Sequence, residues 1–349
     1  MVAGTFRSFV AFYFIISSLW VFTCQADEAE DDFYRWVENE GQSRISGVGV
    51  FLSTTQRTGI NLASLSRATA SLSETEKLVF APSCRARNID LDLRSDVTSY
   101  RYEKIVFHQG RSRQEIADIS PEEVEALRAE PSSAGSLKCK ITVDDGTKVV
   151  FYDAYADPDN GLTATINRTR NGKTIFQQFG LCWDREKTRE NIRTALKQHN
   201  AQFRARREGN MTYVSFSIAA TSSSLEFVLE RGEQLVAREI RSRMGGHLLT
   251  EELNSNFFRT SSGDWFPERR EKLSYITLDG KDICLCHETI EVLGNSLDFN
   301  MHVDESLFRV SMPVGTILTD FTHPEVKEIV LTEANIDIDQ LLILDQVDK

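Results

Sequence analysis

Apolar and polar positions alternate with a period of two along most of the chain after residue 136. Leu137, Cys139 and Ile141 begin this alternation, and many similar segments follow. Because successive side chains of a strand project to opposite faces, a period of two is typical of half-buried β-strands. The pattern predicts strands over 211–219, 224–230, 233–243, 246–260, 264–279, 282–293 and 306–311.

Short turn signals separate these predicted strands, as at Asp279–Gly280. Strands joined by short turns pair with their neighbours in the sequence, so the pattern predicts an antiparallel meander. The strands are long, and we therefore expect one strongly curved sheet. Phe216, Ile218, Phe227 and Leu229 supply one apolar face only to residues 211–230. A single apolar face favours a plain scaffold over an apolar cavity in this region.

The clearest helix signal lies just before residue 124. Ser120 can cap a helix, Pro121 needs no hydrogen-bond partner at the first position, and Glu123 completes a capping box. This helix should end before Pro131, and a further short helix is expected after Pro324. Together these elements predict an α+β protein that is mostly antiparallel β. We expect a curved open sheet or half-barrel with helices packed on or in the concave side.

The N-terminus predicts a cleaved secretory leader. An apolar run from Phe9 to Phe22 is too short to span a bilayer and is followed by Cys24 and Ala26, then by acidic residues. Lipidation of Cys24 and an uncleaved anchor are the alternatives. The predicted division is 1–26 signal peptide, 27–135 mixed N-terminal segment, 136–320 antiparallel meander with one inserted helix, and 321–349 C-terminal tail. The meander and part of 27–135 are expected to form one domain.

Export would place the mature chain in the periplasm or outside the cell, without a membrane-spanning segment. The formal net charge of −12 disfavours binding to phosphate backbones, so we expect no nucleic-acid partner. A local basic cluster of Arg204, Arg206 and Arg207 is interpreted as a solvated linker.

The cysteines after the leader are odd in number, so at least one thiol is expected to lack an intrachain partner. On a regular strand Cys284 and Cys286 would share one face and fill it as small apolar side chains. A disulfide to another strand, or a zinc site completed by His302 or His247, is the alternative. A single residue between two ligands wraps a metal poorly. We therefore expect no metal site, no cofactor and no catalytic residues.

Residues 263–320 carry a series of short motifs. A Trp-x-Pro step opens a strand, an Asn precedes an acidic-Ser-x-Phe turn, and a Pro-x-Gly-Thr segment closes the series. The residues singled out as a possible ligand or structural motif are Trp265, Pro267, Asn300, Phe308, Pro313 and Gly315. Read from the residues alone, Trp265, Pro267 and Phe308 favour a structural role over ligand contact.

These motifs resemble the C-terminal half of exported proteins in the lipoprotein-carrier superfamily (LolA/LolB-like). The resemblance implies an unclosed antiparallel barrel around helices, an apolar concavity for acyl chains, and a Gram-negative-type periplasm or cell envelope. The first functional hypothesis is therefore a non-catalytic exported protein that binds an apolar ligand or lipidated partner in a curved β-sheet. The alternatives are a protein-interaction or sensor module of the cell envelope and an uncharacterised hydrolase.

Overall fold

A computed structural model describes most of the chain after the predicted leader. The described residues are 28–42, 46–60, 62–70, 80–85, 87–108, 111–144, 148–153, 163–168, 194, 196–198, 200–263, 265–278, 280–294, 296–308, 310–322, 327–332 and 335–336. The predicted signal peptide, including Cys24, lies outside these residues.

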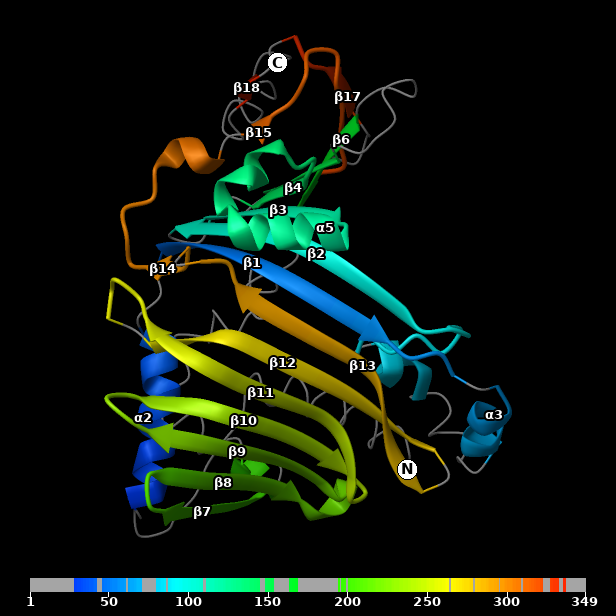
Figure 1. Cartoon of the computed structure of the whole chain (residues 1–349), viewed down its shortest axis with the longest axis vertical. Coiled ribbons are helices and arrows are strands. Elements are labelled where there is room, and N and C mark those ends of the chain that lie inside the picture. The colour runs from blue at the N-terminus through cyan, green and yellow to red at the C-terminus, as the bar shows by residue number, and fades with distance from the viewer. Residues whose placement is uncertain are drawn as a thin grey trace.

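Most described strands form one large open sheet (Figure 1). From one edge to the other its strands are β17 (Lys327–Val330), β16 (Ile317–Asp320), β6 (Thr163–Arg168), β5 (Lys148–Asp153), β4 (Lys140–Asp144), β3 (Arg111–Ile119), β2 (Val97–His108), β1 (Ser46–Arg57), β13 (Lys281–Val292), β12 (Trp265–Leu278), β11 (His247–Arg259), β10 (Leu235–Met244), β9 (Ser223–Arg231), β8 (Met211–Ile218) and β7 (Gln202–Glu208). Along this path only β6 and β16 pair in parallel. The predicted fold class, an α+β protein with a curved open sheet of mainly antiparallel strands, is confirmed.

Smaller elements complete the described fold. A short strand β14 pairs with β1, and β15 pairs with β18 in a separate two-stranded sheet. The bounds of these strands and of the 3-10 turns are β14 (Asp298–Phe299), β15 (Val310–Ser311), β18 (Asn335–Ile336), η1 (Pro131–Ser136), η3 (Ala219–Thr221) and η4 (Glu305–Phe308).

Strands β8 to β13 follow the predicted meander closely, but two neighbouring predictions were wrong. Residues 306–311 form the turn η4 and the two-residue strand β15 instead of one strand. The short helix predicted after Pro324 is the edge strand β17, whose Ile329 and Val330 are β-branched and extend the sheet beyond β16.

The strands of residues 46–119 lie at the centre of the sheet. Strand β1 pairs with β2 on one side and with β13 on the other. The N-terminal segment therefore joins the meander of 202–292 to strands β4, β5 and β6.

Helices cover the sheet from opposite sides. Helix α2 (Glu28–Gln42) lies behind the β7–β12 region in Figure 1, whereas α5 (Pro121–Ala129) lies in front of β2 and β3. A third helix, α3 (Leu62–Ala70), contacts β12. The predicted capping box of α5 is confirmed: the Glu123 N–H donates to Ser120 Oγ at 3.2 Å, and the Ser120 N–H donates to the Glu123 carboxylate at 2.7 Å. No helix within the described ranges is long and apolar enough to cross a membrane.

The buried face of the sheet changes along its width. We call the side that faces α2, with Val214, Phe227 and Leu229, the inner face, and the opposite side the outer face. Following the cross-strand register through the sheet places Val143 and Val150 of β4 and β5 on the outer face. There they form a core with residues of the C-terminal segment. The two ends of the sheet therefore bury opposite faces.

Strands β1 and β2 bury both faces. Phe51 and Ile105 belong to an inner-face cluster rich in phenylalanine, whereas Leu52 and Tyr102 pack on the outer face with α5. The core of the sheet therefore passes from the inner face to the outer face at β1 and β2.

Candidate functional site

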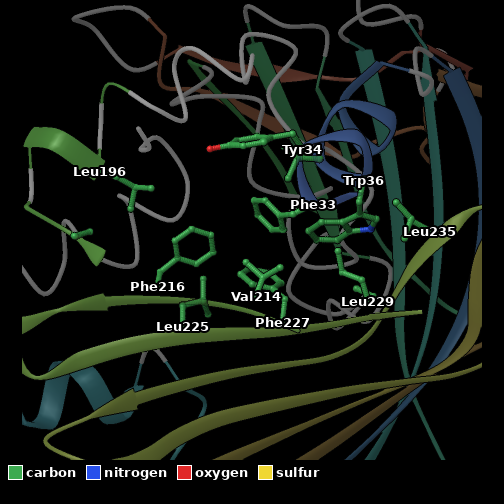
Figure 2. Packing of buried hydrophobic residues seen from close by; sticks show 13 residues of the cluster. Phe33, Tyr34, Trp36, Leu196, Val214, Phe216, Leu225, Phe227, Leu229 and Leu235 are labelled. Carbon is green, nitrogen blue, oxygen red and sulfur yellow. The ribbon is translucent and has the colours of Figure 1, made fainter. Parts of the chain in front are cut away.

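An aromatic cluster fills the concave side of the sheet at the β7–β10 end. Phe33 and Trp36 of α2 point toward Phe216 and Phe227 of the strands beneath (Figure 2). Ring centroids lie 5.4 Å apart for Phe33 and Phe216 and 5.5 Å apart for Phe33 and Phe227, within the range of favourable aromatic pairs. The apolar face expected for residues 211–230 is thus covered by a helix of the same chain. We call the buried residues of this core, among them Phe33, Trp36, Val214, Phe216, Phe227 and Leu229, the α2 cluster.

A buried carboxylate fastens α2 to the sheet. The Asp32 side chain is fully buried, and its carboxylate accepts hydrogen bonds from Arg207 at 2.8 Å and from the Thr212 hydroxyl at 3.1 Å. Arg231 forms a further ion pair with the same carboxylate. A buried charge needs such partners, because an unpaired one is strongly destabilising. Asp32 therefore fixes the position of α2 on β7, β8 and β9.

The basic cluster of β7 is part of the sheet, so its interpretation as a solvated linker was wrong. Phe203 and Ala205 pack against the α2 cluster, and Arg207 projects to the same side, toward Asp32. Arg204 and Arg206 alternate with them and project from the outer face. Arg204 and Arg206 thus lie on the polar side of an amphipathic strand at the sheet edge.

A hollow of about 1060 Å³ lies at this end of the sheet. Most of its described lining projects from the outer face of β7 to β10, namely Arg204, Arg206, Met211, Tyr213, Ser215, Glu226, Val228, Glu239 and Arg241. The remaining described lining comes from Glu30 of α2 and from four inner-face residues of the strands, Phe203, Ala205, Val214 and Phe227. The described lining therefore combines seven apolar or aromatic side chains with six charged ones and a serine.

The charged groups of this lining are largely paired. Arg241 lies between Glu239 and Glu251, with 2.7 Å to the Glu251 carboxylate. Burial raises the pKa of Glu239, while Arg241 opposes this shift. The Arg206 guanidinium lies 4.7 Å from the centre of the Tyr213 ring, a cation–π geometry.

The outer face of β11 to β13 carries polar side chains in contact with one another. His287 Nε2 lies 2.9 Å from the Glu271 carboxylate, and the Tyr275 hydroxyl donates to Glu251 at 3.2 Å. Burial raises the pKa of Tyr275 to about 12. Since His287 and the Arg269 guanidinium hydrogen-bond to Glu271, they lower the pKa of that carboxyl.

The two neighbouring cysteines do not share a face. A register shift between Ser274 and Tyr275 places Cys286 opposite Ser274 and Cys284 opposite Tyr275. Because consecutive residues project to opposite sides, the prediction of a common face for both thiols was wrong. Cys286 packs in an apolar cluster with Leu285, and its burial raises the pKa of the thiol to about 11.

The described cysteines, Cys84, Cys139, Cys284 and Cys286, are all free thiols. Burial also raises the pKa of Cys84 and brings the pKa of Cys139 to about 11, which disfavours the nucleophilic thiolate. Within the described ranges, no three His, Cys, Asp or Glu side chains are grouped to hold a metal.

A buried carboxyl lies on the inner face of the central strands. Glu103 is 4% exposed and accepts a hydrogen bond from the Gln114 side-chain amide. Burial is the main reason why the pKa of Glu103 rises to about 7, with the Gln114 bond and Arg101 acting in the opposite direction. Its charge therefore changes near neutral pH.

The structure spreads the residues of the carrier-like motifs over the sheet. Trp265 begins β12, where its N–H donates to the Gln234 side chain at 3.1 Å, and Pro267 stands opposite Phe257 in the same hairpin. Asn300 has a positive φ of 54° and its N–H donates to the Ser46 carbonyl at 2.8 Å.

The other three motif residues lie near the opposite end of the sheet. Phe308 is 1% exposed and packs in the core over β4 to β6, below the Arg111 guanidinium. Pro313 accepts hydrogen bonds from Thr316, and Gly315, with a φ of +91°, donates to the Leu331 carbonyl at 2.8 Å. These six residues thus do not converge on one place.

Sequence reasoning missed Asp32 and the role of α2. The helical spacing of Phe33, Trp36 and Val37 was a usable signal, since these residues share one side of a helix. No local pattern linked Asp32 to Arg207 and Arg231, which are far away in the sequence.

No protein-family model matches the chain, and no curated protein matches it. Among solved structures, a Vibrio parahaemolyticus domain provisionally assigned as an outer membrane lipoprotein-sorting protein is similar with a TM-score of 0.35 and 8% identity. The alignment covers 78% of this chain and 92% of that domain. At this level the similarity carries no argument about fold or function.

Proposed function

We propose that this is an exported, non-catalytic protein that holds an apolar ligand, or the lipid chain of a lipidated partner, at the β7–β10 end of its sheet. The observation that carries the proposal is the hollow of about 1060 Å³. Ligand sites are concave, mainly apolar, and roughly 300–1,000 Å³ in volume, with few polar groups that fix orientation. Met211, Tyr213 and Val228 supply apolar surface within this hollow.

The test is uptake of a fluorescent fatty acid by the mature protein, together with native mass spectrometry of the protein as purified. Val228→Trp should fill part of the hollow and weaken binding at least tenfold, because Val228 lines the hollow and a strand tolerates an aromatic residue. Val330→Trp is the matched control, because Val330 is 60% exposed on the far edge strand.

Saturable uptake that is lost only in Val228→Trp would support the proposal. A wild-type protein that is purified empty and takes up no probe would overturn it. The chemical state of the recovered probe separates binding from turnover: an intact fatty ester supports a binding protein, whereas a cleaved ester would favour the hydrolase alternative.

A protein-interaction module is a second candidate. Phe151, Phe321 and Val330 are exposed by 44%, 50% and 60% at the β4–β17 end of the sheet. Exposed apolar side chains of this size are typical of protein contacts when they lie together. Loss of a co-purifying envelope protein in Phe151→Ser and Val330→Ser, with unchanged fatty-acid uptake, would favour this function over the first.

A further inference from the structure

Strand β7 presents two arginines on the outer face in an otherwise acidic protein. Arg204 and Arg206 both line the hollow, and both are exposed. Arg207, on the other face, is engaged by Asp32 and Glu28. These two arginines lie at the edge strand of a chain whose net charge is −12.

Arg204 differs from the other arginines of the hollow. Arg206 forms an ion pair with Glu208 and covers the Tyr213 ring. Arg241 forms ion pairs within its own face. Among the described residues, no side chain forms an ion pair or hydrogen bond with the Arg204 guanidinium, which stands beside Ser215 in the register.

None of the described acidic side chains of the lining forms an ion pair with Arg204. Glu226 lies 3.6 Å from Arg243, and Glu239 is paired with Arg241. A guanidinium without a carboxylate partner, next to an apolar surface, suits a carboxylate or phosphate head group, which it can bind through two parallel hydrogen bonds.

We propose that Arg204 binds the anionic head group of the ligand, so that the ligand is a single-chain anionic amphiphile. Its chain would lie along Tyr213, Met211 and Val228. This inference rests on the proposed function and gives it a ligand class.

The test compares three probes with the same twelve-carbon chain: dodecanoate, dodecyl phosphate and the neutral dodecanol. Each is titrated against a bound fluorescent fatty acid. The wild-type protein should bind an anionic probe about tenfold more tightly than dodecanol, the size expected for one charged hydrogen-bonding partner. The tighter of the two anionic probes identifies the head group as carboxylate or phosphate.

Two variants isolate the role of Arg204. Arg204→Gln should remove the preference for the anionic probes and leave the affinity for dodecanol unchanged. Arg101→Gln is the control, because it removes an exposed arginine from β2 with the same change in net charge. Equal affinity for dodecanol and both anions, or an unchanged preference in Arg204→Gln, would overturn the inference and leave the proposed function standing. Failure of all three probes to displace the fluorescent fatty acid would overturn the inference alone, whereas a wild-type protein that takes up no fluorescent fatty acid would overturn both.

Discussion

The β7–β10 end and the β4–β6 end of the sheet are stabilised in different ways. At the first, a helix from the N-terminal segment covers the inner face and is fixed by a buried ion cluster around Asp32. At the second, the C-terminal segment covers the outer face with a core around Phe308 and Met312. One continuous sheet thus supports two cores on opposite faces.

This difference teaches where an exposed surface is available for binding. At the first end the outer face carries the hollow and Arg204, which forms no ion pair with the residues that the structure describes. At the second end the inner face carries the exposed Phe151, with Val330 at the sheet edge. The surface left open by each core is therefore the surface proposed for ligand or partner.

Phe33→Ala should produce the largest effect on stability. Phe33 is fully buried and contacts three rings of the strands, so its truncation should lower the free energy of unfolding by about 4 kcal/mol. Phe308→Ala, in the opposite core, should cost about the same, and urea titration measures both. Because both cores share one sheet, we expect a single transition that each variant shifts. A loss below about 1 kcal/mol in Phe33→Ala would contradict the packing of α2.

Glu103→Gln should change how stability depends on pH. The folded-state pKa of about 7 lies above the ordinary value of 4.5, so the folded protein retains a proton that the unfolded chain releases. The wild-type protein should therefore lose stability as pH rises from about 4.5 to 7, by about 3 kcal/mol from this group.

Glutamine mimics the protonated form of Glu103 and still accepts the hydrogen bond from Gln114. The free energy of unfolding of the variant should therefore equal that of the wild type at pH 4 and exceed it by about 3 kcal/mol at pH 8. Thermal unfolding across this range measures the difference. Parallel pH profiles for both proteins would show that Glu103 does not titrate in this window.

Asp32→Asn should lower the free energy of unfolding by about 2 kcal/mol, because it leaves Arg207 and Arg231 without their buried anion. Hydrogen exchange should localise the effect to α2 and to the strand ends that carry Arg207, Thr212 and Arg231. Comparing Asp32→Asn with Phe33→Ala separates the stabilisation that the buried ion pairs give to α2 from that given by aromatic packing. Protection of α2 that is identical to the wild type would exclude Asp32 as its anchor.

Ser120→Ala should have the smallest effect, about 1 kcal/mol, because it removes one cap of α5 at the protein surface. Ser120→Asp should retain most of the stability, since aspartate is an equally good cap. Circular dichroism during thermal unfolding measures both variants. If alanine and aspartate behave alike, the capping hydrogen bond is not stabilising.

Local signals in the sequence were sufficient to predict α5 and the strands β8 to β13, but not β15 or β17. Ser120 and Glu123 mark the start of α5 correctly, and the turn at Gly280 separates two strands as expected. The prediction for Cys284 and Cys286 was wrong because of a bulge opposite Ser274. The alternation of residue types did not indicate this register shift.

The long-range arrangement could not be predicted from the same signals. The position of β1 between β2 and β13 depends on pairing between residues far apart, as does the contact of Asp32 with Arg231. The candidate hollow was missed for the same reason: Arg204 and Arg206 were interpreted as charges on a linker, and only their place beside β8 makes them part of a site.

The central place of β1 also bears on biosynthesis. Its Phe51 pairs with Val292, so one hydrogen-bonding edge of this strand has no native partner until the second half of the chain has been made. Pairings of such large sequence separation close slowly, and an open edge favours aggregation while it waits. A nascent chain with this topology would gain from a chaperone that shields the edge until the meander has formed.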